Sequence, residues 1–276
     1  GMSPTYNFQA GYFPEHEAIS GDALSRFTTR KKGCFRCPLG CGFVITQHSF
    51  KWTQESEIAV PEYETLAMLG SNLGIDNIEA LIHLNHLCNT LGIDTISLGS
   101  SLAFLAELKE KKLLPLALQH LEKQIPSFGE TEKFLSLIPE ILQQTELGKF
   151  VSLGPAGMAL QCDPAAQEFA IHVKGLPMAA WDPRGKWFLG LSYATAAIGA
   201  SHLRGWAVGL PPPQSFDQQN PDHQQAFQTF LEQIDLKLLK DSLIICHFTH
   251  SISPPLALRD MPPLLEALTA SHYDQR

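Results

Sequence analysis

The sequence predicts a mostly α-helical chain made of two helical sub-domains. Two observations favour this class: apolar residues recur at three- and four-residue spacings along much of the chain, and no stretch shows the alternation typical of a strand. We find no internal repeat. The 276 residues are 44% hydrophobic, enough for a sizeable core. We place the sub-domain boundary near Val151, which divides the chain into residues 2–150 and 151–276.

The first sub-domain begins with mixed sequence, in which Ser20, Gly21 and Asp22 lead into a short helical pattern. We expect this pattern to end in the basic cluster 30–32, directly before the first cysteines. The helices that follow are predicted at residues 62–69, 78–89, 102–112, 116–124 and 134–145. Asp76 is placed to cap the second of these helices.

The second sub-domain begins with a segment rich in Gly, Pro and small residues, residues 151–173, which indicates loops and short helices. Residues 187–210 resume a helical texture, with small residues that allow close helix approach. Three prolines at 211–213 end it and begin a polar linker through Asp222. Amphipathic helices are predicted at 227–239 and 254–268.

The charge of the chain bears on its partners. A net charge of -8 and a pI near 5.7 argue against general affinity for nucleic acid or anionic membranes. Charged residues are only 17%, against about 25% in an average domain, so a partner or a large ligand is expected to cover part of the surface. No bilayer-spanning run or secretory signal is evident, which favours the cytoplasm. Gly1 resembles the scar of a cleaved tag, and Met2 would then be the natural start.

Three of the six cysteines are clustered as Cys34-x-x-Cys37-x-x-x-Cys41. Such clustering without a signal peptide points to a metal rather than to disulfides, and the glycines around it favour a tight loop. Zinc would favour paired Cys-x-x-Cys knuckles, so an iron-sulfur cluster is the better match. Cys88 and Cys162 lie in apolar surroundings and are predicted to be core residues. By spacing alone, Cys246 has no better claim to a metal than Cys88.

Several segments, in order along the chain, resemble one family. They are GCFRCPLGCG at 33–42, PEYETLAMLGSNLGI at 61–75, LCNTLGIDTISLG at 87–99, VKGLPMAAWDPRG at 173–185, LSYATAAIGASHLRG at 191–205 and DSLIICHF at 241–248. With these segments the chain resembles the aldehyde ferredoxin oxidoreductases. Those tungsten or molybdenum pterin enzymes oxidise aldehydes to carboxylic acids and pass electrons through a 4Fe-4S cluster to ferredoxin. The resemblance implies the helical C-terminal domains of that family, without its N-terminal β-sheet domain.

The resemblance also implies roles for individual residues. Cys34, Cys37 and Cys41 would be the first three ligands of the 4Fe-4S cluster, and Cys246 the fourth. Glu64 would be the carboxylate beside the tungsten or molybdenum, and His202 the histidine that faces it. Together they would accept a proton and donate a hydrogen bond next to the aldehyde.

The pterins are held in this family by two Asp-x-x-Gly-Leu motifs. The first reads Asn89-Thr90-Leu91-Gly92-Ile93-Asp94 here, so Asn89 replaces the leading acid while Gly92 and Asp94 are kept. The second retains Asp241, but Ile244 stands where glycine is expected. A β-branched residue is unfavourable where the backbone must approach a ligand or adopt an unusual conformation. Other polar groups for the pterins are Lys174, Asp182 and Arg184.

His83 and His86 lie three residues apart on one predicted helix, where some relatives place a Glu-x-x-His metal site between subunits. They could bind zinc or iron, or be exposed side chains without a ligand.

Full members of the family are roughly twice as long and begin with the sheet domain that supports the pterin. The resemblance therefore favours an aldehyde oxidoreductase that is split or truncated. A separate chain would supply the sheet domain, and ferredoxin would be the electron acceptor. A homodimer is a further expected form of assembly. The alternatives are a non-catalytic iron-sulfur electron-transfer or binding module, and a degenerate relic.

Overall fold

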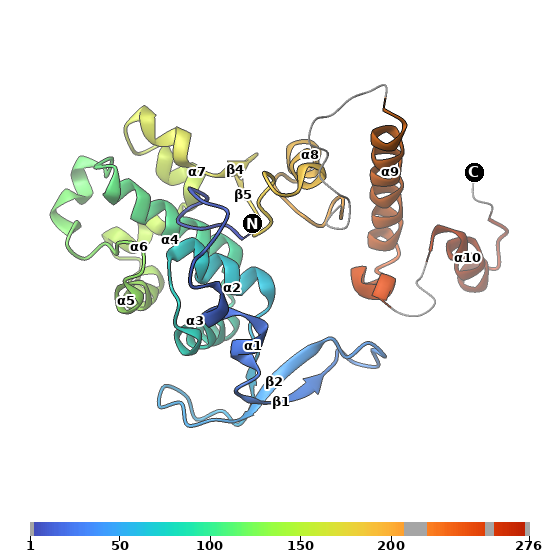
Figure 1. Cartoon of the computed structure of the whole chain (residues 1–276), viewed down its shortest axis with the longest axis horizontal. Coiled ribbons are helices and arrows are strands. Elements are labelled where there is room, and N and C mark those ends of the chain that lie inside the picture. Colours follow the sequence, from blue (N-terminus) through green and yellow to red (C-terminus); the bar gives the residue numbers. More distant parts are fainter. Residues whose placement is uncertain (1–2, 207–219, 252–256, 274–276) are drawn as a thin grey trace.

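A computed structural model describes residues 3–206, 220–251 and 257–273. Most helices pack into a body around α4, a β-hairpin extends from this body, and α8, α9 and α10 follow one another away from it (Figure 1). The mostly α class is confirmed.

The helices are short except for α3, α4, α5 and α9. They are α1 (Gly21–Leu24), α2 (Tyr63–Leu69), α3 (Ile78–Leu91), α4 (Thr95–Glu110), α5 (Thr131–Gln143), α6 (Glu146–Ser152), α7 (Gly154–Ala159), α8 (Trp187–Thr195), α9 (Pro221–Ser242) and α10 (Met261–Thr269). Short 3-10 helices lie at His16–Ile19, Ser71–Leu73, Leu116–Leu121, Pro164–Phe169, His247–Ser251 and Leu258–Asp260.

Helix α4 is the centre of the main core. All its residues from 98 to 108 are buried, because α2, α6 and α7 pack around it. The approach of α2 is so close that a Cβ on Gly99 would lie 2.4 Å from the carbonyl oxygen of Met68. This contact fixes α2, the helix that carries Glu64, against the most buried part of the molecule.

Helices α3 and α4 meet at a turn that combines two capping devices. Helix α3 begins at Asn77, whose side chain accepts hydrogen bonds from two backbone amides, so the expectation that Asp76 caps it is wrong by one residue. It ends at Gly92, which has a left-handed φ of 70°. Asp94 then caps α4 by accepting a hydrogen bond from the amide of Ser97 at 2.8 Å.

The expectation that the chain lacks strands is wrong. An antiparallel sheet of order β1-β2-β3 is formed by Thr28–Lys32, Gly42–Gln47 and Ile58–Ala59, and a second sheet by β4 (His172–Val173) and β5 (Leu176–Pro177). The basic cluster 30–32 therefore lies on β1 and does not end a helix. No apolar alternation marks β1 because residues 29–32 are exposed on both faces of the strand, and β2 buries only Val44 and Ile45.

Other predicted helices differ in extent. Residues 116–121 form a 3-10 helix, and the predicted helix at 187–210 is helical only over α8, up to Thr195, within the part of that range that the structure describes. Residues 207–219 and 252–256 lie outside the described residues. Most of the predicted polar linker falls in the first of these two ranges. The helices predicted at 62–69, 78–89, 134–145 and 227–239 are confirmed, with small shifts of their ends.

A second, smaller core joins α8 to α9. The rings of Phe188 and Phe230 lie 5.5 Å apart there, with Leu189, Tyr193 and Ala200 buried around them. The main core continues past Val151 to Ala166. The division of the chain near Val151 stays a prediction.

Within the described ranges, no single helix is long and apolar enough to cross a membrane; α3 and α4 pass such a test only as a pair bent by 120°.

Candidate functional site

The side chains of Glu64 and His202 face each other. Glu64 lies in the first turn of α2, and His202 lies in the segment after α8. The distance from His202 Nε2 to Glu64 Oε1 is 3.4 Å, and the two side chains are only 13% and 19% exposed. Glu64 Oε2 accepts a hydrogen bond from the amide of Ala180 at 2.7 Å, whereas the buried Oε1 has no hydrogen-bond partner among the described residues.

Burial moves the two pKa values in opposite directions. It raises the pKa of Glu64 from 4.5 to about 7, opposed in part by the Ala180 amide and the Trp181 side chain. It lowers the pKa of His202 from 6.5 to about 4. At neutral pH the imidazole is therefore neutral, while the carboxyl group exchanges its proton readily. A carboxyl group with a pKa near the operating pH is suited to general acid-base chemistry.

Aromatic side chains that sequence reasoning did not single out surround this pair. The hydroxyl of Tyr63 donates to the carbonyl of Ala180 at 3.0 Å, and that of Tyr193 donates to the carbonyl of Trp181 at 3.1 Å. Trp206 lies 5.9 Å from Trp181 between ring centroids. The two tyrosines thus hold the backbone whose amide binds Glu64. Tyr63 and Trp181 lie inside segments that carry the family resemblance. Their place in those segments was the only sequence feature that could have indicated a role at this site.

Trp206 also connects the pair to the predicted cluster region. Its ring centroid lies 5.7 Å from that of His202 and 4.9 Å from that of His247, the residue after Cys246.

The side chains of Asp182, Arg184 and Lys174 are engaged within the chain. Asp182 is 1% exposed, and its Oδ1 and Oδ2 share a bifurcated hydrogen bond from Arg184 Nε, at 2.9 and 3.1 Å. Arg184 Nη2 also donates to the carbonyl of Phe8 at 2.8 Å, and Lys174 Nζ donates to the carbonyl of Ala196 at 2.9 Å. These contacts position the segment around Trp181. Pterin binding by the three residues stays a prediction.

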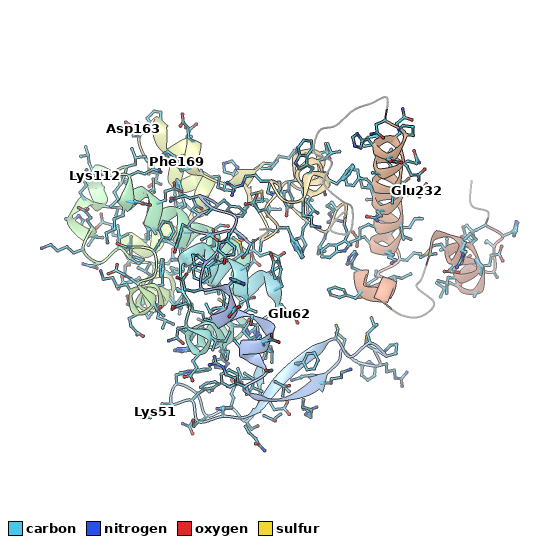
Figure 2. All side chains as sticks on the ribbon, viewed as in Figure 1. Lys51, Glu62, Lys112, Asp163, Phe169 and Glu232 are labelled. Carbon is cyan, nitrogen blue, oxygen red and sulfur yellow. The ribbon has the colours of Figure 1, made fainter. Side chains whose placement is uncertain are left out.

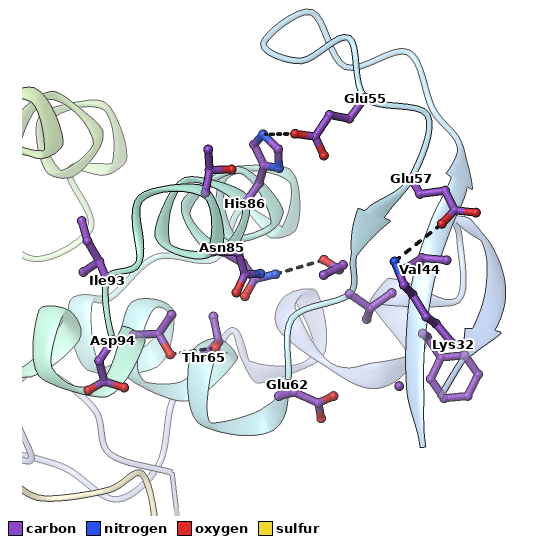
Figure 3. Close-up of a pocket in the computed structure, with 17 residues that line it drawn as sticks. Lys32, Val44, Glu55, Glu57, Glu62, Thr65, Asn85, His86, Ile93 and Asp94 are labelled. Carbon is purple, nitrogen blue, oxygen red and sulfur yellow. Dashed lines mark hydrogen bonds and ion pairs between the residues drawn. The ribbon is translucent and has the colours of Figure 1, made fainter. Parts of the chain in front are cut away.

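The first predicted pterin motif borders a cavity of about 690 Å³ between the sheet and α2, α3 and α4. Asn89 and Asp94 line it, together with Asn85, one turn before Asn89 on α3, and Thr65 on α2 (Figure 3). Asn85 Nδ2 donates to the carbonyl of Ala59 at 3.0 Å, and this bond ties α3 to β3 across the cavity. Gly92 does not line the cavity but makes the turn that places both motif residues there.

The second predicted pterin motif is constrained in two ways. Asp241 forms ion pairs with Lys237 and with Arg204, whose Nη1 lies 2.7 Å from Asp241 Oδ2. Ile244 has a left-handed φ of 56° and is 94% exposed. The structure thus has, at the residue where glycine was expected, the unusual backbone conformation that glycine favours.

The four predicted cluster cysteines are free thiols at least partly accessible to solvent. Cys34, Cys37 and Cys41 lie in the loop joining β1 to β2, where a Cβ on Gly33 would lie 3.2 Å from the Cα of Gly40. Cys246 follows α9. The chemistry of these donors fits an iron-sulfur cluster. In the described parts of the chain, however, no three His, Cys, Asp or Glu side chains are gathered closely enough to hold a metal, so the structure gathers neither the three loop cysteines nor Cys246 with any two of them.

The remaining candidates divide between core and surface. Cys88 is 1% exposed in the main core, as predicted, and Cys162 packs partly buried against it. His83 stacks on Trp52 with ring centroids 4.4 Å apart, and His86 Nε2 lies 3.9 Å from Glu55 Oε1. The histidine pair is thus in contact with other side chains, and metal binding there stays a prediction.

Comparisons with known proteins agree on one family. The family described as aldehyde ferredoxin oxidoreductase, domains 2 and 3, matches residues 1–276. Tungsten-containing aldehyde ferredoxin oxidoreductases of Thermococcus kodakarensis and Pyrococcus furiosus are 34% identical over 255 and 259 residues; each match covers 90% of this chain and 40% of the relative. The aliphatic sulfonate oxidoreductase, WOR-like subunit, of Pyrococcus furiosus is 29% identical over 72% of this chain and 32% of its own length.

A solved structure shares the fold. The BamBC active-site complex of benzoyl coenzyme A reductase, with 1,5-dienoyl-CoA, superposes with a TM-score of 0.69 at 17% identity over 99% of this chain and 46% of that chain. The chain spans about 40% of the length of the first curated relatives it matches. It belongs to the aldehyde ferredoxin oxidoreductase family and corresponds to domains 2 and 3 of that family.

Proposed function

We propose that this chain supplies the acid-base residues and the cluster ligands of an oxidoreductase that converts aldehydes to carboxylic acids. The observation that carries the proposal is the buried pair of Glu64 and His202, in which Glu64 Oε1, without a hydrogen-bond partner among the described residues, lies 3.4 Å from His202 Nε2. The relatives named as tungsten-containing aldehyde ferredoxin oxidoreductases support the same reaction class.

Oxidation of an aldehyde to an acid adds the oxygen of one water molecule and releases two electrons and two protons. Glu64 would take a proton from that water, because its pKa of about 7 lets it accept and release protons near neutral pH. His202, neutral at this pH, would bind the aldehyde oxygen through a ring N–H. The aromatic side chains around the pair would exclude bulk water and strengthen both interactions.

Two groups would supply the redox chemistry. A tungsten or molybdenum bis-pterin would accept the electrons from the aldehyde, and a 4Fe-4S cluster would pass them on singly to ferredoxin. In this chain the cluster would be held by Cys34, Cys37, Cys41 and Cys246. Because no three of these cysteines are gathered among the described residues, cluster binding would have to rearrange the loop between β1 and β2 and draw the end of α9 toward it.

The pterins need more than this chain. Asn89 and Asp94 line the 690 Å³ cavity and would contribute polar groups to one pterin. Asp241 would first have to exchange its ion pairs with Arg204 and Lys237 for a contact with the other. We propose that a sheet domain, supplied by another chain, closes the cofactor site, with a homodimer as a further form of assembly.

The test is metal analysis by mass spectrometry, with a visible spectrum, on the chain isolated without oxygen together with any protein that copurifies. About four iron atoms per chain with stoichiometric tungsten or molybdenum, and aldehyde-dependent reduction of a viologen dye, would support the oxidoreductase. Absence of iron would refute the assigned cluster.

A second candidate is an iron-sulfur electron-transfer or binding module that has lost its pterins. Asn89 in the first motif and Ile244 in the second favour it, since both depart from the pattern that holds pterin. Iron without tungsten or molybdenum, in the chain and in every copurifying protein, would select this candidate.

A further inference from the structure

Basic residues are concentrated in one part of an acidic chain. Residues 23–54 contain six Lys and Arg side chains and no Asp or Glu. The remaining residues contain 14 basic and 28 acidic side chains, so all of the net negative charge lies outside this segment. Such a separation of charge produces a local positive potential that can attract and orient an acidic partner.

The structure places four of these cations on the β-hairpin formed by β1, its loop and β2, hereafter the basic hairpin (residues 28–47). They are Arg30, Lys31, Lys32 and Arg36. Every residue from 29 to 36 is exposed, on both faces of the strand. The hairpin projects from the body of the molecule, with its loop on the side toward α9 (Figure 1).

Acidic side chains of the body compensate this charge only in part. Glu57 pairs with both Arg30 and Lys32, so a single carboxylate serves two cations. Lys31 and Arg36 form no ion pair with any residue that the structure describes. The basic hairpin therefore keeps an excess of positive charge directed toward solvent.

An exposed aromatic ring completes the surface. Phe35 is 89% exposed, and the guanidinium of Arg36 lies 5.2 Å from its ring centroid. Phenylalanine and arginine are both enriched at protein interfaces, and a guanidinium near an aromatic ring is a favourable contact. Another explanation of the lysines is that charged side chains on an edge strand prevent it from pairing with a strand of another molecule. That role explains neither Arg36 nor Phe35, which lie in the loop.

We propose that the basic hairpin is the docking surface for a small acidic electron-carrier protein. The partner is a redox protein because Phe35 and Arg36 lie between Cys34 and Cys37, so a carrier bound there would sit beside the cluster. Its acidic side chains would meet the four cations, and Phe35 would be buried at the centre. This inference rests on the proposed function, in which ferredoxin is the electron acceptor.

The test is isothermal titration of the chain, with its cluster reconstituted, against an oxidised acidic ferredoxin. Lys31→Glu combined with Arg36→Glu should weaken binding at least about tenfold in about 0.05 M salt, and under about threefold in about 0.5 M salt, where screening shortens the reach of the charges. Phe35→Ser should weaken binding at both salt concentrations. A visible spectrum of each variant is recorded as a control, to check that its cluster is intact.

The matched control is Lys51→Glu combined with Lys123→Glu, which changes the net charge equally. Lys51 lies in the loop at the opposite end of the sheet (Figure 2), and Lys123 lies outside the basic segment. Equal weakening by both pairs would overturn the docking surface. So would binding of an unstructured DNA strand at least as tight as that of the ferredoxin.

Failure of the surface and failure of the function are separable. If the unaltered chain binds ferredoxin and the hairpin variants bind equally well, the surface is wrong and the acceptor stands. If the unaltered chain does not bind ferredoxin, both the surface and this acceptor are wrong. Aldehyde oxidation is judged separately by reduction of a viologen dye, which needs no docking surface.

Discussion

Replacing Glu64 by Gln should stabilise the chain, and more so as the pH rises. Glutamine has the shape of the protonated carboxyl group: its carbonyl can keep the hydrogen bond from the Ala180 amide, and its amide can donate to neutral His202. The change therefore removes the ionisation of Glu64 with little change of packing. Any gain in stability then measures how strongly the folded protein opposes that ionisation.

The magnitude follows from the pKa of Glu64, which burial raises from 4.5 to about 7. Below pH 4.5 the carboxyl group is protonated in both the folded and the unfolded chain, and the substitution changes little. Between pH 4.5 and 7 the unfolded chain loses its proton while the folded chain keeps it, so the folded state becomes progressively less favourable. Above pH 7 the cost is complete, at roughly 3 kcal/mol, and at pH 5 it is under about 1 kcal/mol.

The assay is urea unfolding, followed by tryptophan fluorescence, of both proteins at pH 5 and pH 8. We expect Glu64→Gln to exceed the unaltered chain by about 2–3 kcal/mol at pH 8 and by less than about 1 kcal/mol at pH 5. Glu122→Gln, at an exposed glutamate, is the control and should give no such difference. A gain that does not grow with pH would refute the idea that burial sets the pKa of Glu64.

Three further substitutions test other parts of the structure by thermal or urea unfolding. Gly99→Ala would gain about 1 kcal/mol of helix propensity, but its Cβ would clash with the Met68 carbonyl, so we expect a net loss of about 1–2 kcal/mol of stability and a lower Tm. The control is Gly21→Ala, whose Cβ would lie in open space. A higher Tm for Gly99→Ala would contradict the close packing of α2 and α4. Asp182→Asn should cost about 2 kcal/mol, since it weakens the buried contacts with Arg184, and an unchanged midpoint would mean that those contacts contribute nothing. Ile244→Gly should raise the urea midpoint by the equivalent of about 0.5–1 kcal/mol, because the residue is exposed and left-handed; a lower midpoint would count against strain there.

Helices were predictable where apolar periodicity and capping residues coincide. Helix α3 combines apolar residues at helical spacing with a polar cap, so its position was predicted and only the cap, Asn77 instead of Asp76, was missed. Adjacent Asp and Asn residues are both good caps, and only the backbone conformation chooses between them. The basic hairpin was missed because residues 29–32 of β1 are exposed on both faces of the strand, which leaves no apolar alternation to detect.

The candidate site was predictable to different degrees. Glu64 and His202 were paired through the family resemblance, and no periodicity in the sequence would have brought together two residues that are 138 positions apart. The hydrogen bonds of Tyr63 and Tyr193 were not predicted, because both hydroxyls donate to backbone carbonyls. Every residue has a backbone carbonyl, so the sequence does not indicate which one a tyrosine will bind. The described residues do not gather the four cysteines, so their joint binding of a cluster stays a prediction that rests on the family resemblance.

The uneven division of the core has a consequence for how the acid-base pair moves. Amides of α4 are enclosed by the main core and should exchange with solvent deuterium only when that whole core opens, and α2 is packed against them. The core beside α8 and α9 contains only six buried hydrophobic residues among those described, and its amides should exchange sooner. Glu64 thus belongs to the slowly exchanging part and His202 lies beside the faster one. The gap between the two side chains can open and close while the carboxyl group stays in place.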